Sequence, residues 1–429
     1  MRAILGPIAA LLLSQALLLA GHGLQLTVLP LRATLEGFTD TEVAFTGSAY
    51  FAGFVLGCLL TPRVVRRAGH IRAFAVMASL YSAVALIFDL LPNIYSWLSL
   101  RVLTGVTIAG LYMILESWLN ERATPETRGT LLSVYTLINL TMIIAGQQLV
   151  NVAAPEASTL FALSAILLSL AVIPVSLTRA LAPAPLQSTR IELRSVLRDS
   201  PVAVGGTLAS GFAGGAFWAL GPVYAAASGL ATGEVTRFLS VAVLGGVLLQ
   251  VPLGRMSDHY DRRLVLLGTA LFGVLASIGL ASMGPDAGWL LYLAALAWGA
   301  FVFTIYAICL AHANDNAEAG HFVAIGTAIL LLNGAASAVG GPVASMFMDT
   351  LGPAGLFWFS SGVLGIYALQ IVWRLHVRQR PAIDETEPFR PVGEVTPVAL
   401  EMDPRVDSDW IPPEQETGGD DEPPAAAAG

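Results

Sequence analysis

The sequence predicts an all-α membrane protein in which twelve transmembrane helices form two pseudo-symmetric six-helix bundles. Three observations support this fold class. The 429-residue chain is 55% hydrophobic and only 12% charged, with a mean hydropathy of +0.71, far from the composition of soluble globular proteins. Apolar stretches long enough to cross a hydrocarbon core of about 30 Å recur along most of the chain. Finally, the second half of the chain repeats features of the first.

The apolar stretches follow one another up to residue 374, and each predicts one transmembrane helix. The first stretch follows Arg2 and resembles a signal peptide, but its apolar run is too long and lacks a convincing cleavage site, so it is expected to be the first helix. The predicted spans are 6–29, 42–61, 71–91, 95–119, 130–153, 158–178, 201–226, 235–254, 263–283, 287–312, 321–346 and 353–374.

The internal repeat consists of uncommon residues that recur in the second half at a nearly constant spacing. A shift of 194 residues aligns Gly105, Tyr112, Asn120, Glu121, Asn139 and Gly146 with Gly299, Tyr306, Asn314, Asp315, Asn333 and Gly340. A shift of 192 aligns Pro30, Gly37, Glu42, Gly53 and Arg63 with Pro222, Gly229, Glu234, Gly245 and Arg255. A duplicated half in so hydrophobic a chain is typical of transporters whose halves rock around a central site. Polar residues present in one half only are therefore candidates for function.

The repeat and the composition divide the chain into four parts. Residues 1–178 and 201–378 are expected to form the two bundles, joined by a cytoplasmic linker at 179–200. Residues 379–429 form a tail that is rich in proline, alanine and acidic residues, and we expect it to be disordered. A solvated tail and an acidic partner-binding segment are both open interpretations.

The placement of arginine predicts the topology. All 22 basic residues are arginine, and most of those outside the tail follow the even-numbered helices. Because basic loops stay on the cytoplasmic side, both termini are expected there. The two cysteines, Cys58 and Cys309, fall inside predicted helices at non-equivalent positions, so neither a disulfide nor a metal site is expected.

The loop after the eighth predicted helix contains a recognisable motif. Gly254, Asp258, Arg262 and Arg263 match the signature Gly-x-x-x-Asp-Arg/Lys-x-Gly-Arg-Arg, from which His259 and Asp261 depart. Here the chain resembles the major facilitator superfamily (MFS), and the resemblance covers about residues 1–378. It implies the MFS fold, membrane transport and a multi-pass protein of the bacterial inner (plasma) membrane. In the equivalent N-terminal loop, Arg66 replaces the acid of the signature.

The fourth predicted helix strengthens this resemblance. Arg101 and Gly105 match the family's pattern of arginine followed four residues later by glycine, and residues 112–121 are similar to the bacterial YcaD-type branch. The Gly-Pro-rich antiporter motif of the fifth helix is absent. This absence weakens an interpretation as a classical drug–proton antiporter.

A central substrate cavity is expected between the halves. Arg101 and His22 have Ala295 and Gly214 at their equivalent positions, so the scaffold does not require them. Arg101 either attracts an anionic or carbonyl group of the solute or snorkels to the interface, and His22 either relays protons or packs. The residues expected in the cavity are His22, Arg101, Tyr112, Asn139, Gln147, Tyr306 and Asn333.

A second group of charges is expected to serve coupling or latching. Glu116 is predicted to form a charge-swapped latch with Arg66 or Arg67, which pairs in one conformation and separates in the other. Asp258, Arg262 and Arg263 would form its counterpart in the second half. Two alternatives remain: the arginines only orient the loops, or Glu116 carries a coupling proton, because burial favours a neutral carboxyl group.

The sequence therefore predicts a secondary active transporter of a small solute that works by alternating access, with protons as the expected coupling ion. The alternative is a transporter-fold sensor or scaffold that binds a solute or partner without net flux. No P-loop, metal-ligand cluster, catalytic triad or nucleic-acid-binding patch is apparent in the sequence, so neither enzyme activity nor a cofactor is expected. The expected partners are the solute, the lipid bilayer and protons, and the expected oligomeric state is a monomer.

Overall fold

The computed structural model describes residues 8–123, 127–177, 193–284, 287–315, 321–377 and 396–400. Over these ranges the regular structure is entirely helical. Twelve of the helical spans are long and apolar enough to cross a membrane. The predicted number of spans is therefore confirmed.

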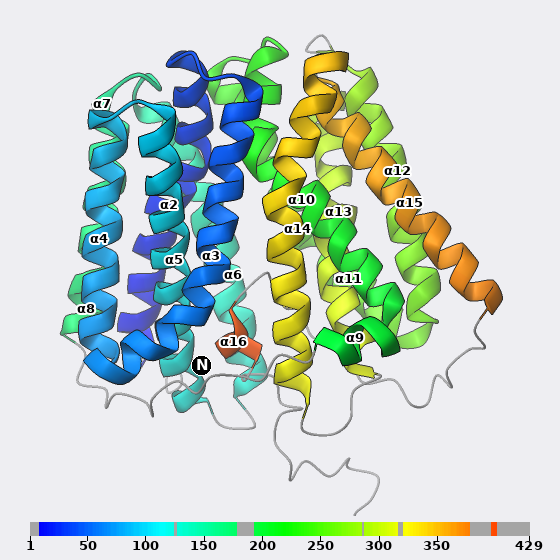
Figure 1. The fold of residues 1–429 in the computed structure, drawn as a ribbon, viewed down its shortest axis with the longest axis horizontal. Coiled ribbons are helices and arrows are strands. Elements are labelled where there is room, and N and C mark those ends of the chain that lie inside the picture. Colours follow the sequence, from blue (N-terminus) through cyan, green and yellow to red (C-terminus); the bar gives the residue numbers. More distant parts are fainter. Residues whose placement is uncertain are drawn as a thin grey trace, which may run out of the picture.

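The helices form two groups that lie side by side, coloured blue to cyan and green to orange in Figure 1. The first group comprises α2 (Ala9–Leu35), α3 (Asp40–Ala68), α4 (His70–Leu90), α5 (Ile94–Arg122), α6 (Arg128–Gln148) with the 3-10 turn η2 (Leu149–Val152), α7 (Ser158–Leu170) and α8 (Val172–Ser176). The second comprises α10 (Pro201–Ala227), α11 (Thr232–His259), α12 (Arg262–Ser282), α13 (Trp289–Asp315), α14 (Phe322–Leu351) and α15 (Gly355–Val377). Two shorter helices are α9 (Leu193–Asp199) and α16 (Pro397–Leu400).

Several helices extend beyond the predicted apolar spans. For example, α3 continues from the predicted end at residue 61 to Ala68, through Arg63, Arg66 and Arg67. Arginine is a good helix former, so the backbone stays helical after the apolar run has ended. The sixth span behaves differently, because it breaks between α7 and α8 at Ala171. Pro174 explains this break, since proline lacks the N–H that would bond to the carbonyl group four residues earlier.

Repeated glycines hold equivalent helix pairs together in both halves. A Cβ atom on Gly105 would collide with the backbone of α3 at Tyr50, and one on Gly299 would collide with the backbone of α11 at Ala242. Gly146 abuts α2 and Gly340 abuts α10 in the same way. Glycine allows these backbones to approach closely, as in other membrane helix pairs. The repeat in the sequence thus encodes a repeat in helix packing.

The repeated pair Glu42 and Glu234 also has a structural role. The Glu42 carboxylate accepts a hydrogen bond from the backbone N–H of Thr39 at 2.8 Å, at the start of α3. The Glu234 carboxylate does the same for Ala231 at 2.9 Å, at the start of α11. Each glutamate therefore satisfies a backbone donor at a helix N-terminus.

The bundle has two ends, which we name here by their loops. The basic end holds the loops between α3 and α4 and between α11 and α12, and the arginine runs lie in the helix ends beside these loops. The far end holds the loops between α2 and α3 and between α10 and α11. The helix α9 and the short helix α16 lie at the basic end (Figure 1).

Part of the C-terminal tail differs from its predicted disorder. Thr396, Val398 and Leu400 are buried, and they belong to a segment that contacts α5 and α14. Apolar side chains at positions 398 and 400 give this short stretch a surface to bury, which the surrounding acidic sequence lacks. The other tail residues, 379–395 and 401–429, and linker residues 179–192, lie outside the described residues.

Candidate functional site

A central cavity of about 210 Å³ lies between the two groups of helices. Helices from both groups form its wall, so a bound solute would touch both halves of the molecule. Its lining residues are His22, Leu26, Gly47, Tyr50, Phe51, Phe54, Arg101, Tyr112, Thr136, Asn139, Leu140 and Ile143 from the first group, and Trp218, Ala219, Val243, Gly246, Val247, Gln250, Phe303, Leu330, Asn333, Gly334 and Ser337 from the second.

Arg101 lines this cavity from α5 and is 4% exposed. Its Nε donates a hydrogen bond to the backbone oxygen of Thr46 at 3.2 Å. The guanidinium carbon lies 4.7 Å from the centre of the Tyr50 ring, a cation–π contact. The Nη1 atom is buried and has no hydrogen-bond partner among the described residues. Thr46 and Tyr50 therefore hold the side chain in place, and its Nη1 can still donate hydrogen bonds.

His22 lines the cavity from α2, where two tyrosines hold its ring. Its Nδ1 is hydrogen-bonded to the Tyr81 hydroxyl group at 2.5 Å, and its Nε2 to the Tyr50 hydroxyl group at 3.2 Å. The Tyr50 ring also stacks against the imidazole, with 5.7 Å between centroids. Tyr50 thus connects His22 to Arg101.

Sequence reasoning missed both tyrosines, although the repeat contains the signal that identifies them. At a shift of 192 residues, Tyr50 and Tyr81 correspond to Ala242 and Gly273. They are specific to the first half, as are His22 and Arg101.

The remaining predicted cavity residues divide into two sets. Tyr112, Asn139 and Asn333 lie in the cavity wall. Gln147 and Tyr306 do not, which corrects the prediction for both. Gln147 is the penultimate residue of α6 and accepts a hydrogen bond from Ser240 in the opposite half at 3.0 Å. Tyr306 is buried within the second group at 2% exposure, so the repeated tyrosines have different environments in the two halves.

A chain of hydrogen bonds runs from the cavity wall to Glu116. Gln15 Nε2 donates to Asn139 Oδ1 at 2.9 Å and to the Tyr135 hydroxyl oxygen at 3.3 Å. The Tyr135 hydroxyl group then donates to Glu116 Oε1 at 2.8 Å. Glu116 is fully buried in α5. The cavity and this carboxylate are therefore connected through three side chains.

The predicted latch between Glu116 and Arg66 or Arg67 is not formed in this structure. Arg66 and Arg67 are exposed at the end of α3, and neither is ion-paired with Glu116. Instead, Glu116 accepts hydrogen bonds from Tyr135 and from the Thr396 hydroxyl group of the tail. The two arginines are exposed, whereas Glu116 is fully buried between the helices.

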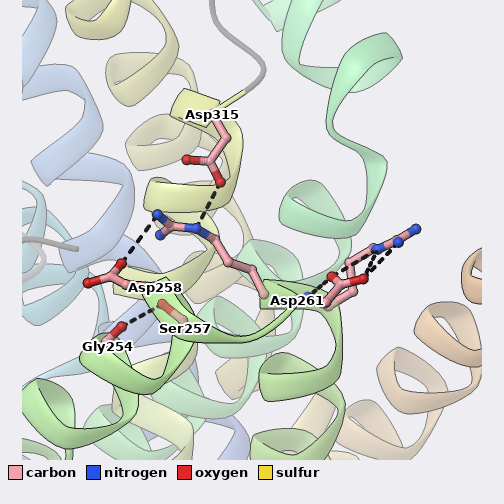
Figure 2. Close-up of polar contacts among 7 residues, drawn as sticks. Gly254, Ser257, Asp258, Asp261 and Asp315 are labelled. Carbon is pink, nitrogen blue, oxygen red and sulfur yellow. Dashed lines mark hydrogen bonds and ion pairs between the residues drawn. The ribbon is translucent and has the colours of Figure 1, made fainter. Parts of the chain in front are cut away.

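In the second half, the corresponding loop carries a cluster of ion pairs (Figure 2). The buried Arg262 guanidinium lies 3.4 Å from Asp258 and 2.8 Å from Asp315. These pairs join the end of α11, the start of α12 and the end of α13. In the first half, His70 occupies the position equivalent to Arg262, with its Nε2 hydrogen-bonded to Ser117 at 3.2 Å. The two loops have therefore diverged in chemistry.

Asp261 and Arg263 form a further ion pair beside these two, at 2.8 Å. Asp261 also accepts a hydrogen bond from the Arg263 backbone N–H at 2.9 Å and so caps α12. Burial alone would favour the neutral acid, but the hydrogen bonds and positive charge of Arg263 outweigh it and lower the pKa of Asp261. The departure from the family signature at Asp261 thus supplies a helix cap.

Polar contacts join the two halves directly at the far end. The Thr41 hydroxyl group at the start of α3 lies 3.2 Å from the Ser345 hydroxyl group and 3.3 Å from Asp349 Oδ2, near the end of α14. On the other side, Gln148 Nε2 donates to Ser240 Oγ at 2.8 Å. Side-chain hydrogen bonds therefore join the two halves at the far end of the bundle.

Comparison with known sequences identifies the family. Residues 11–337 match the sequence profile of the Major Facilitator Superfamily. This chain belongs to that superfamily. The MFS-type transporter YcaD of Shigella flexneri serotype 5b is 29% identical over 368 residues, covering 85% of this chain and 95% of YcaD. YcaD of Escherichia coli O139:H28 is similar to the same extent. The predicted YcaD-type resemblance is therefore confirmed, and the chain is a multi-pass membrane transporter by family.

Solved structures share the MFS fold with this chain. The nucleoside transporter NupG superposes with a TM-score of 0.73 at 12% identity, covering 85% of this chain and 98% of NupG. A bacterial homologue of the human lysosomal transporter Spinster, inward-facing and occupied, gives 0.68 at 15% identity, covering 87% and 98%. A D-xylose–proton symporter gives 0.65 at 15% identity, covering 88% and 98%. At these identities the likeness extends to the fold alone.

Proposed function

We propose that this MFS protein is a proton-coupled secondary transporter that moves a small solute by alternating access. The observation that carries the proposal is the central cavity, which is walled by both halves, together with the contacts that join the halves at the far end. Breaking those contacts would open that end. In this mechanism the halves at residues 1–178 and 201–378 rock around the solute.

The arginine-rich loops support an orientation with the basic end in the cytoplasm. In this orientation the far end faces the opposite side of the bacterial inner membrane, and both ends of the described bundle, Ile8 and Val377, are cytoplasmic. The conformation with a closed far end then corresponds to the inward-facing side of the transport cycle. The protein would work as a monomer, because one chain supplies the whole cavity wall.

Proton coupling is supported by the buried chain between Asn139 and Glu116. A carboxyl group buried among helices is costly to ionise and normally has a functional reason. Protonation of Glu116 would change the acceptor available to Tyr135 and so affect Gln15 and Asn139 at the cavity. His22 is the second candidate, because its ring bridges two tyrosines at the cavity wall.

Flux into proteoliposomes tests this function. Solutes are first selected by their stabilisation of the purified protein, and each hit is then assayed with and without a pH gradient. We expect a hit to be transported, and faster with the gradient. Solute binding without flux would instead support the sensor or scaffold interpretation.

The Glu116→Gln variant tests the proposed proton site, with Glu121→Gln as control because Glu121 is exposed at the end of the same helix. We expect the first variant to lose the effect of the gradient and the second to keep it. Full gradient-driven transport by Glu116→Gln would remove Glu116 from the mechanism.

A further inference from the structure

Among the described residues that line the cavity, one carries a fixed positive charge and none is an acid. Arg101 is the only lining residue with a formal charge if His22 is neutral, and neither aspartate nor glutamate is among the described lining residues. The described residues also place no carboxylate in an ion pair with Arg101. A buried charge without a partner is expensive in a membrane protein. An anionic solute would remove that cost.

The unpartnered Nη1 of Arg101 indicates how such an anion would bind. With Nε already donating to Thr46 and the ring of Tyr50 against the guanidinium, the planar group has a fixed orientation. Arginine binds carboxylates through charge-assisted hydrogen bonds, often two in parallel. A single guanidinium balances a single negative charge, so a monoanion fits the cavity better than a dianion.

The opposite half contributes two aromatic rings to the cavity wall. Trp218 and Phe303 both line the cavity, and their rings are stacked with 5.8 Å between centroids and 24° between planes. The Phe217 ring packs against both, with its centroid 5.8 Å from that of Trp218 and 5.9 Å from that of Phe303. Aromatic faces stack favourably with other rings. The cavity therefore offers a charge in one half and a stacking surface in the other.

The size of the cavity limits the solute. Its volume of about 210 Å³ is below the range of about 300–1,000 Å³ that is usual for drug-sized ligands. One or two fused rings fill such a space.

We propose that the cavity binds a small aromatic monocarboxylate, with the carboxylate on Arg101 and the ring against Trp218 and Phe303. This proposal rests on the proposed function and names the chemical class of its solute. Asn139, Asn333 and Gln250 provide further polar groups in the wall for substituents on the ring.

Binding to the purified full-length protein tests the solute class without any requirement for transport. Three probes of similar shape are compared by calorimetry: 2-naphthoate, its neutral amide 2-naphthamide, and the saturated decalin-2-carboxylate. We expect 2-naphthoate to bind at least ten times more tightly than the amide and several times more tightly than the saturated acid. Equal binding of the acid and the amide, or no binding of any probe, would overturn the proposal.

Variants assign the binding to the named residues. Arg101→Gln is expected to abolish the preference for acid over amide, and Arg101→Lys to weaken it. Arg237→Gln is the matched control, because Arg237 is exposed at the far end and loses the same charge. Trp218→Leu is expected to abolish the preference for the aromatic over the saturated acid. Naphthoate binding without flux would leave the solute class standing and contradict only the transport function.

A second inference comes from the tail segment. Thr396, Val398 and Leu400, named here the tail wedge, are buried at the basic end. The segment contacts α5 of the first half and α14 of the second. The Thr396 hydroxyl group donates to Glu116 Oε2. Leu400 packs where Gly326 of α14 has no side chain, and a Cβ atom there would lie 2.5 Å from Leu400 Cδ1.

We propose that the tail wedge is an autoinhibitory element that holds the two halves apart at the basic end. For the far end to open by rocking, the basic end must close, and the space between α5 and α14 is occupied by buried side chains. The wedge must therefore leave before the halves can rock. Its contact with Glu116 would make release sensitive to events at the cavity, through Tyr135, Gln15 and Asn139.

Distance measurements at the far end test this element without a solute. Spin labels are attached at Val152 and Arg237, which are exposed at the far end in opposite halves, after Cys58 and Cys309 are replaced by serine. We expect a single short distance in the full chain. Deletion of residues 378–429, or Gly326→Leu, is expected to add a longer distance.

The matched control is Gly268→Leu, because a Cβ atom at Gly268 meets nothing within 4 Å. This variant should keep the distribution of the full chain. Identical distributions in the truncated chain, Gly326→Leu and the full chain would overturn the autoinhibitory role.

Discussion

At the residue scale, Glu116 shows how a buried carboxylate depends on its neighbours. We predict that Tyr135→Phe lowers the free energy of unfolding by about 1–3 kcal/mol, the usual cost of leaving a buried polar group without its partner. Thermal unfolding in detergent measures the effect. Tyr95→Phe serves as the control, because Tyr95 is exposed at 81% and should tolerate the change. Equal unfolding temperatures for the two variants would show that the bond to Glu116 contributes nothing.

The sequence predicted the unusual residues of the cavity better than their partners. Arg101, His22 and the pair Asn139 and Asn333 were found because they are polar residues in apolar helices, or because they recur. Tyr50 and Tyr81 were missed because tyrosine is compatible with both an apolar core and a polar wall. Only the fold shows that their hydroxyl groups meet the His22 ring.

At the scale of elements, the repeated glycines give a symmetric prediction. Gly105→Ala and Gly299→Ala should each destabilise the protein by about 1–3 kcal/mol, as overpacking does in tightly packed interiors. The methyl group would force α5 from α3 in one case and α13 from α11 in the other. Thermal unfolding checks both variants against Gly268→Ala, which has open space around it. A fall in stability for one half only would contradict the equivalence of the two pairings.

The loop between α11 and α12 gives a prediction that depends on pH. Since the pKa of Asp261 is lowered in the folded protein, its ionised form contributes stability above the usual carboxyl pKa of about 3.9. That contribution is lost as the pH falls through the lowered value. We predict that Asp261→Asn lowers the unfolding temperature at pH 7, and that the difference narrows in strong acid.

Asparagine keeps the ability to cap a helix, so this substitution isolates the charge. Glu121→Gln, at an exposed position, should have little effect at any pH. A difference for Asp261→Asn that persisted unchanged in strong acid would assign the loss to packing and not to the ion pair with Arg263.

The existence of each transmembrane helix was predictable from the sequence, but the residues at which the helices end or break were not. Hydropathy identifies the part of a helix that crosses the membrane, so all twelve spans were found. It says nothing of a helix that continues through arginines, as α3 does to Ala68. Nor does it locate a break such as the one before Pro174, which depends on a single missing donor.

At the scale of the whole molecule, the contact between Thr41 and Asp349 offers a way to block rocking. We predict that the Thr41→Cys, Asp349→Cys pair, in a chain without Cys58 and Cys309, forms a disulfide that holds the far end closed. Flux of 2-naphthoate into proteoliposomes should then be lost and should return on reduction. Each single cysteine variant is a control, and flux through the oxidised double variant would argue against rocking at this end.

The predicted latch shows what a single sequence cannot supply at this scale. An acid near the basic end and neighbouring arginines suggested a pair, but Glu116 in this conformation is bonded to Tyr135 and to Thr396, the latter 280 residues away. Contacts between distant segments depend on which conformation the halves adopt. The pattern of charges along the chain does not show which conformation the two halves adopt.

The division of the cavity wall has one more consequence. The guanidinium belongs to one half and the stacked indole–phenyl pair to the other. A solute that contacts both groups would therefore hold the two halves together. A small carboxylate without a ring, or a ring without a carboxylate, would occupy only one side. Such fragments would compete for the cavity without drawing the halves together, and would therefore be inhibitors that are not themselves carried.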